Sequence, residues 1–255
     1  MSNIAKTSIK DPGFESEWSQ NRKKDVKELF KVQAKKYDLH DDIIGLGMHR
    51  MWARQVMKSI GAFVAGRDEA NLLDLGCGTG FIAFRVAQKY SNIDIDGFDI
   101  TEEMIEVAKQ RQDKYFANRK MNFWVGDAEI PYGQDKYDVI TTCFAFRNYA
   151  NKALATENIF KALKPGGMLV IQEMTKPEHQ PMRGIYLFAL KNFLPVIGKI
   201  IGVAPASPQY LYKTVMLMPK NKDVKTLLEE KGFSNVSYKS MSFGIGTVIV
   251  GYKPA

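Results

Sequence analysis

A glycine-rich loop follows the first predicted strand of the chain. The segment LLDLGCGTG, Leu72 to Gly80, places glycines at positions 76, 78 and 80 after an acidic residue, Asp74. A dinucleotide-binding loop needs glycine or alanine three residues after its second glycine, where this chain has Phe81. An aspartate beside the loop would repel a pyrophosphate, but it can face an ammonium group directly or through water. The loop therefore favours S-adenosylmethionine, which has an ammonium and a sulfonium group and no phosphate, over a plain tight turn.

Two later acidic residues occupy matching places after the next predicted strands. Asp99, in GFDIT, can accept hydrogen bonds from both ribose hydroxyls, and Asp127, in VGDAEIP, can accept from the adenine amino group, with Ala128 beside the ring. Either aspartate alone would more simply be a helix cap or a loop acid. Together they mark the carboxyl ends of neighbouring strands, where open α/β sheets bind their ligands. The expected cofactor contacts are Asp74, Gly76, Cys77, Gly78, Thr79, Gly80, Asp99, Ile100, Asp127 and Ala128.

The elements that position these residues alternate along the chain from Asn71 onward. Short apolar runs (LLDL, IDIDGFD, MNFWVGD, YDVITTCF and GMLVIQE) are separated by amphipathic stretches of helical length. This alternation predicts right-handed crossovers and a parallel sheet. Two more predicted strands, VSYKSMSF and GTVIVGYK, lie near the C-terminus. The sequence thus predicts an α/β fold with a seven-stranded, mostly parallel sheet and helices on both faces.

Changes in this pattern divide the chain into four segments. Residues 1–69 carry two helical patterns and are expected to form an N-terminal helical cap. Residues 70–175 are expected to form the cofactor-binding core and residues 176–220 a helical lid insertion. Residues 221–255 supply a helix and the strand pair that completes the sheet.

Composition and cysteine content are those of an ordinary globular protein of 255 residues. No apolar stretch reaches the roughly 18 residues of a membrane span, and no secretory signal is visible. Its two cysteines, Cys77 and Cys143, lie in different motifs, which argues against a disulfide framework and fits a reducing compartment. No spacing of cysteine, histidine or carboxylate residues predicts a metal site. We expect a cytoplasmic protein that needs no metal.

The net charge of +8 is concentrated near the C-terminus. Residues 176–255 contain eleven Lys and Arg against four Asp and Glu. Scattered lysines usually serve solubility, and attraction to an anionic membrane surface or to nucleic acid is the functional alternative.

Beyond the glycine loop, the chain resembles the ubiquinone/menaquinone biosynthesis C-methyltransferases from about Phe30 to Tyr252. The matching stretches are AKKYDLHDDIIGLGMHRMW, FAFRN, QEMTKP, FLPVIGKIIG, PQYLYKTV and LEEKGFSNVSYKSMSFGIGTVIVGYK. The resemblance implies a Rossmann-like class I methyltransferase that transfers a methyl group from S-adenosylmethionine to a ring carbon of a polyprenylated quinol, with demethylmenaquinol favoured. Two departures stand out. The loop reads LGCGTG where many members have Ala-Gly-Gly-Thr-Gly, and Ala145-Phe146 replaces a glycine and an aliphatic residue, so that bulky Phe146 bears on the ring pocket.

The implied reaction gives roles to polar residues after the fourth strand. A ring carbon becomes nucleophilic when the neighbouring hydroxyl loses its proton, so the enzyme has to stabilise a phenolate. Arg147 can do so directly or by activating a water, while Asn148 positions it; the alternative is an arginine paired to an acid at a helix start. His49, in LGMHRMW, is the leading candidate base, and Tyr37 with Asp38 could close over the ring. A structural histidine and a core tyrosine are the simpler interpretations.

The insertion RGIYLFALKNFLPVIGKIIGVAP is too polar to span a membrane and too apolar for an ordinary exposed helix, with Lys191 and Lys199 interrupting it. We expect a lid whose inner face receives the polyprenyl tail and whose lysines meet anionic headgroups. Packing of the lid against the sheet is the alternative. The expected partners are therefore a tailed quinol, a membrane surface at its cytoplasmic side and a second copy of the chain.

Three other functions compete with C-methylation of a quinol. A nucleic-acid methyltransferase would suit the basic charge, but no base-flipping motif or arginine-rich patch is present, so no nucleic acid is expected. A non-catalytic adenosylmethionine-binding scaffold would not need Asp74, Asp99 and Arg147 together. A methyltransferase of a small soluble aromatic compound would not need the apolar insertion.

Overall fold

The structure, a computed structural model, describes residues 19–33, 47–200, 202 and 206–255. Seven strands form one sheet in the order β3-β2-β1-β4-β5-β7-β6. The first five run parallel, whereas β7 is antiparallel to both β5 and β6. The predicted α/β fold with a mostly parallel sheet is thereby confirmed. The strands are β1 (Ala70–Leu75), β2 (Ile93–Asp99), β3 (Met121–Val125), β4 (Tyr137–Cys143), β5 (Leu163–Met174), β6 (Ser234–Met241) and β7 (Gly246–Tyr252).

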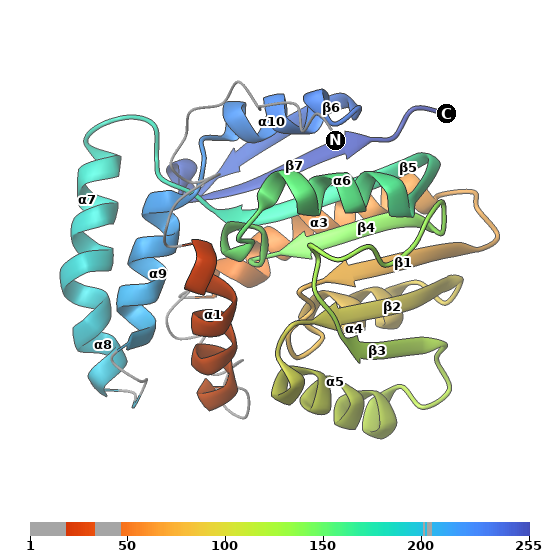
Figure 1. Cartoon of the computed structure of the whole chain (residues 1–255), viewed down its shortest axis with the longest axis horizontal. Helices are drawn as coiled ribbons and strands as arrows, with labels where there is room; N and C mark the ends of the chain where they lie inside the picture. The colour runs from red at the N-terminus through yellow and green to blue at the C-terminus, as the bar shows by residue number, and fades with distance from the viewer. Residues whose placement is uncertain (1–18, 34–46, 201, 203–205) are drawn as a thin grey trace.

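Helices cover both faces of this sheet (Figure 1). One face packs against α3, α4 and α5, and the other against α6 and α10. The strands bury residues on both faces, so nearly every residue of the central strands β1 and β4 is buried. The covering helices are α3 (Met48–Val64), α4 (Phe81–Lys89), α5 (Glu102–Tyr115), α6 (Lys152–Ala162) and α10 (Asn221–Glu230).

The strand order reverses between β1 and β4, which is where an open sheet of this type forms its ligand-binding crevice. Helix α1 (Ser19–Gln33), the short 3-10 turn η2 (Phe146–Asn148) and the lid gather at the carboxyl ends of these strands (Figure 1). The switch point and the segments that cover it are therefore on the same edge of the molecule.

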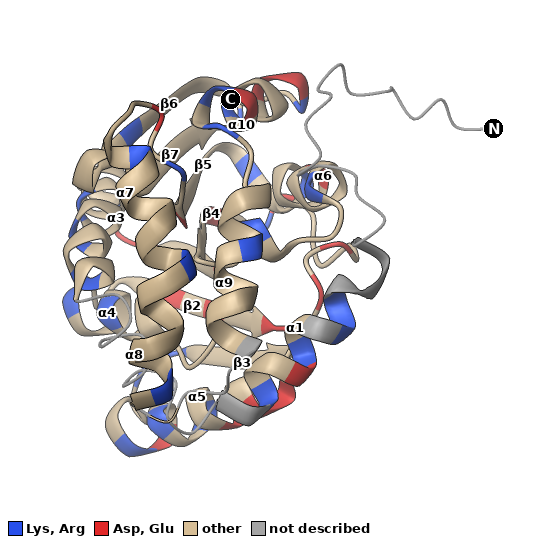
Figure 2. Ribbon diagram, turned by 90° about the vertical axis from the view of Figure 1, so that its left-hand side faces the viewer, with Lys and Arg blue, Asp and Glu red and all other residues tan. Residues whose placement is uncertain are grey.

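The lid consists of a nearly continuous helical arm and a second helix beside it (Figure 2). The arm is built from α7 (Met182–Phe188), the π-helical turn η3 (Ala189–Phe193) and α8 (Leu194–Ile200), and the second helix is α9 (Ala206–Leu217). Three side chains of the arm, Tyr186, Leu190 and Leu194, are buried in a small cluster with Val215 of α9. This cluster joins the arm to α9, and both tail binding on the inner face and packing against the sheet stay predictions.

The outer face of the arm is apolar as well. Five large apolar side chains are more than half exposed along it: Ile185, Phe188, Phe193, Val196 and Ile200. The extra residue per turn in the π-helical segment shifts the register, so that Phe188 and Phe193 come together, with ring centroids 5.8 Å apart. None of the described helices is long and apolar enough to cross a membrane.

Candidate active site

The glycine loop turns tightly between β1 and α4. Gly76, Gly78 and Gly80 have φ angles of 63°, 54° and 88°, a region that other residues rarely adopt. A Cβ atom at Gly76 would also collide with Ala145, and one at Gly80 would collide with the ring of Phe84. Glycine is required at Gly76 because the loop backbone passes close to the segment after β4, and at Gly80 because it packs against the ring of Phe84.

Asp74, at the end of β1, is buried and holds this loop in place. Its Oδ1 accepts a hydrogen bond from the Thr141 hydroxyl on β4 at 2.8 Å, and its Oδ2 accepts from the backbone amide of Ala83 in α4 at 3.2 Å. Burial raises the pKa of this carboxyl to about 7, against the opposing effect of the two hydrogen bonds. Asp74 therefore ties two central strands to the first turn of the helix.

Asp99 faces the loop from the end of β2. Its Oδ2 accepts from the backbone amide of Gly78 at 3.0 Å and its Oδ1 accepts from that of Thr101 at 2.9 Å. Burial raises the pKa of Asp99, while hydrogen bonds from the backbone lower it. Each carboxylate oxygen has a further lone pair, so the side chain can still receive the paired hydroxyls of a ribose.

Asp127 follows β3 and is covered by the N-terminal helix. Its Oδ2 accepts from the ammonium of Lys23 on α1 at 2.7 Å, and its Oδ1 accepts from the backbone amide of Glu129 at 2.9 Å. Lys23 also lies 2.9 Å from the Glu129 carboxylate. Ala128 is buried between the two acids. The predicted adenine end of the site is therefore closed by α1.

One cleft at the carboxyl edge joins Asp99 and Asp127. Asp99, Ile100, Asp127 and Ala128 line one end, with the glycine loop as the floor. Toward the lid the wall becomes aromatic, with residues from α1, β4 and η2, and Asn148 is part of it. A second cavity lies on the α3 side of the loop and shares Gly76, Gly78, Cys143 and Phe144 with the cleft.

The second cavity contains the remaining predicted loop contacts except Gly80, which is absent from the described lining of both. His49 of α3, Asp74, Cys77 and Thr79 line it, and the imidazole lies 5.1 Å from the ring of Phe81. His49 is thus close to the loop but on the opposite side from Asp127. Tyr37, Asp38 and their predicted contacts lie outside the described residues.

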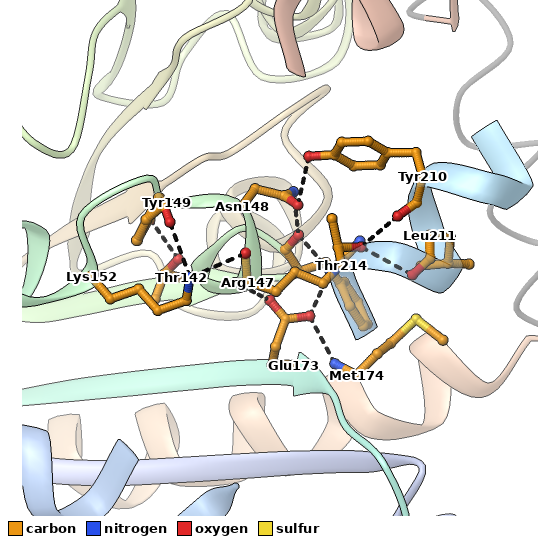
Figure 3. A network of polar contacts seen from close by, with 11 residues as sticks. Thr142, Arg147, Asn148, Tyr149, Lys152, Glu173, Met174, Tyr210, Leu211 and Thr214 are labelled. Atoms are coloured by element: carbon orange, nitrogen blue, oxygen red, sulfur yellow. Dashed lines mark hydrogen bonds and ion pairs between the residues drawn. The ribbon is translucent and has the colours of Figure 1, made fainter. Parts of the chain in front are cut away.

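Arg147 is buried and bound to Glu173, which is fully buried on β5 (Figure 3). Its guanidinium Nη1 donates to Glu173 Oε1 at 2.5 Å and to the Phe144 carbonyl at 2.7 Å, and its backbone amide donates to Glu173 Oε2 at 3.0 Å. The described lining of the cleft includes its neighbour Asn148 but not Arg147. The pairing with an acid that the simpler interpretation expected is present, and a role at the oxyanion stays a prediction.

Asn148 connects the cleft to the lid. Its Oδ1 accepts from the Tyr210 hydroxyl on α9 at 3.0 Å, and its Nδ2 faces the Phe144 carbonyl at 3.4 Å. The ring of Tyr210 meets that of Phe30 from α1 edge-on, with centroids 6.4 Å apart. Three segments that are distant in sequence therefore meet at the aromatic end of the cleft.

Phe146 does not reach the cleft. It is fully buried in the core under α6, edge-on to Tyr149 with centroids 5.7 Å apart. The smaller neighbour Ala145 takes the place beside the loop. The expectation that Phe146 shapes the ring pocket was therefore wrong, because this side chain is completely buried in the core and is absent from the described lining of the cleft.

Sequence reasoning missed three residues of this region. Glu173 and Tyr210 lie in stretches that carry the family resemblance, QEMTKP and PQYLYKTV, but nothing local indicated their partners. Phe144 has a φ of 60°, which is costly for an aromatic residue. Its amide donates to the Gln172 carbonyl at 2.8 Å, and this contact across β4 and β5 holds the strained conformation.

Solved structures share this architecture. The magnesium protoporphyrin IX methyltransferase of Synechocystis PCC 6803, solved with bound S-adenosylhomocysteine, superimposes with a TM-score of 0.61 at 19% identity, covering 91% of this chain and 99% of that one. A methyltransferase from Thermotoga maritima, described as a possible histamine N-methyltransferase, gives 0.61 at 15% identity over 89% and 99%. These similarities confirm the Rossmann-like class I methyltransferase fold.

Proteins found by sequence similarity share a higher identity with this chain than these solved structures do. A ubiquinone/menaquinone biosynthesis C-methyltransferase UbiE of Shewanella pealeana is 32% identical over 94% of this chain and 95% of its own length. The UbiE protein of Francisella philomiragia is 33% identical over 95% and 96%. The family model for ubiE/COQ5 methyltransferases matches residues 18–253. The chain is an S-adenosylmethionine-dependent C-methyltransferase, and it belongs to the ubiE/COQ5 methyltransferase family.

Proposed function

We propose that this enzyme methylates a ring carbon of a polyprenylated quinol, demethylmenaquinol in particular, in menaquinone or ubiquinone biosynthesis. Relatives with 32–33% identity bear this pathway in their names. The observation that carries the proposal is the single cleft, in which the acids Asp99 and Asp127 lie at one end and the aromatic wall of Phe30 and Phe144 at the other. A flat aromatic ring fits between such walls, next to a polar amide that can contact its oxygen.

The chemistry of carbon methylation sets what the protein has to do. S-adenosylmethionine supplies an electrophilic methyl group. The quinol carbon attacks well once the adjacent hydroxyl is deprotonated, so the protein has to stabilise a phenolate and align the ring with the methyl group. We assign the donor to the ring oxygen to Asn148, which lines the cleft. We propose that the positive charge of Arg147 stabilises the phenolate from behind the cleft wall, since its guanidinium binds the carbonyl of Phe144 in that wall.

We propose His49 as the general base. It lines the cavity that meets the cleft at Phe144, and an imidazole ordinarily titrates near neutral pH. Tyr37 keeps its proposed role as a contact to the ring.

The outer face of the lid supports peripheral binding to an anionic membrane at its cytoplasmic side, where a tailed quinol resides. The arm from Met182 to Ile200 contains Arg183, Lys191 and Lys199 and no acidic residue, next to its exposed apolar side chains (Figure 2). Apolar side chains can enter the headgroup region while the cations meet anionic lipids. A homodimer that covers the same face is the competing occupant.

Incubation with labelled S-adenosylmethionine and a panel of tailed and tailless quinols tests this function. We expect label on the ring of the tailed quinol, and turnover in Asn148→Ala that is lower by about 10²-fold or more, as when an oxyanion donor is lost. Equal kcat/KM for tailless compounds would favour a small soluble aromatic substrate. Cofactor binding without transfer to any quinol would favour a non-catalytic scaffold. Transfer of the label to nucleic acid would favour a nucleic-acid methyltransferase.

A further inference from the structure

We propose that Tyr210 of the lid is a positioning residue for methyl transfer, because its hydroxyl fixes the Asn148 carboxamide with the amide N–H group directed to the quinol oxygen. This inference rests on the proposed function, which places the quinol ring in the cleft beside Asn148. Nothing in the local sequence connects the two residues, which are 62 positions apart.

The orientation of the amide follows from its two neighbours. Nδ2 of Asn148 faces the Phe144 carbonyl, which can only accept a hydrogen bond. The carboxamide oxygen therefore has to be the atom 3.0 Å from the Tyr210 hydroxyl, and the tyrosine has to donate. A reversed amide would place two acceptors against each other at Phe144.

The two contacts differ in strength. The Phe144 contact is long, at 3.4 Å, and that carbonyl already accepts from Arg147 at 2.7 Å. The Tyr210 contact has ordinary hydrogen-bond length. Removing the Tyr210 hydroxyl would therefore leave the orientation of the amide to its weaker neighbour.

Tyr210 is itself held on three sides. Its ring is edge-on to Phe30 of α1. One turn later, fully buried Thr214 donates its hydroxyl to the Tyr210 carbonyl at 3.0 Å, which anchors this turn of α9. The helix packs against η2, which carries Asn148 (Figure 3). The lid thus meets the cleft through the hydrogen bond between Tyr210 and Asn148.

The polarity of the amide matters for the reaction. Asn148 is partly exposed and lines the cleft, so its second N–H is placed to bind an oxygen there. A donor stabilises a phenolate more than it stabilises a neutral phenol, whereas a carboxamide oxygen in the same place would repel the phenolate. By fixing the donor end, Tyr210 lowers the pKa of the bound quinol hydroxyl.

Tyr210→Phe removes the hydroxyl and keeps the ring, and Tyr212→Phe, two residues along the same helix, is the matched control. We expect Tyr210→Phe to lower kcat roughly 10-fold with a small change in KM, since positioning is lost while binding surface remains. The pH dependence of kcat should move to higher pH, because the phenolate loses stabilisation. Tyr212→Phe should retain wild-type values.

A second measurement needs no substrate. In ¹⁵N NMR spectra of the full chain, the side-chain amide signal of Asn148, assigned with Asn148→Ala, should shift in Tyr210→Phe and stay in place in Tyr212→Phe. An unmoved Asn148 signal, or wild-type kcat and pH profile in Tyr210→Phe, would overturn the inference. Failure of the wild-type enzyme to methylate any quinol would instead overturn the proposed function, and the NMR result would still decide whether Tyr210 orients the amide.

Discussion

Arg147 binds Glu173 through two separate groups, its backbone amide at 3.0 Å and its guanidinium at 2.5 Å. Both side chains are almost completely inaccessible, and a third contact to the carboxylate comes from the backbone amide of Met174. The pair therefore joins the end of β5 to the turn after β4. Since that turn carries Asn148, the position of the cleft wall depends on a charge pair beneath it.

Glu173→Gln should destabilise the protein strongly. The substitution leaves the buried guanidinium without its counter-charge, and breaking a buried pair in this way costs about 3–5 kcal/mol. Urea denaturation measures the change. Glu157→Gln, which disrupts an exposed pair with Lys161 and Lys231, is the control and should cost no more than about 1 kcal/mol. Similar midpoints for the two variants would show that the buried pair is not a main constraint on this turn.

Asp99→Ala should weaken binding of S-adenosylmethionine. The ribose hydroxyls would lose their acceptor, which costs about 1–3 kcal/mol for a buried polar contact. Isothermal titration calorimetry checks this against Asp94→Ala, on the same strand but paired at the surface with Lys120. Unchanged affinity in Asp99→Ala would refute the cofactor assignment of this residue.

Asp74→Asn should alter the dependence of stability on pH. The pKa of about 7 in the folded protein is above the value of about 3.9 for an aspartate in an unfolded chain. The folded state therefore holds this proton more tightly, so the stabilisation is greatest below about pH 4 and is lost as the pH rises toward about 7. Asparagine cannot titrate and can still accept from Ala83 while donating to Thr141.

The unfolding free energy of Asp74→Asn should accordingly fall less steeply between about pH 4 and 7 than that of the wild type. Denaturation at a series of pH values measures the two slopes, with Asp94→Asn as the surface control. Parallel curves for Asp74→Asn and wild type would mean that Asp74 is ionised throughout this range.

The double variant Phe188→Ser/Phe193→Ser should reduce sedimentation with anionic vesicles. These rings are about 59% and 58% exposed on the outer face of the lid, so their loss removes apolar area without opening the core. Tyr115→Ser, an exposed aromatic change on α5, is the control. Wild-type binding should also weaken as salt shortens the Debye length toward about 3 Å at 1 M. If neither the double variant nor salt changes vesicle binding, membrane docking is contradicted. If light scattering gives the mass of a dimer and the double variant gives that of a monomer, the face binds a second copy of the chain.

The sequence by itself determined the sheet and the cofactor end of the cleft. The alternation of apolar runs with helical stretches specifies a parallel sheet, and a parallel sheet brings the ends of its strands to one edge, so that Asp99 and Asp127 could be expected in one cleft without coordinates. The glycine loop could be predicted from its sequence because its backbone conformation is a local property. These features depend on spacing along the chain.

Tertiary structure alone decided the substrate end. The sequence left Arg147 between a role at the oxyanion and a pairing with an acid, and only the packing showed that its guanidinium pairs with Glu173, 26 residues later on the neighbouring strand. Phe146 turned to the core, and Tyr210 came to Asn148 from the lid. Such contacts join side chains far apart in sequence, and their geometry is set by how separate elements pack. A local pattern carries the identity of each residue but not the direction in which its side chain points.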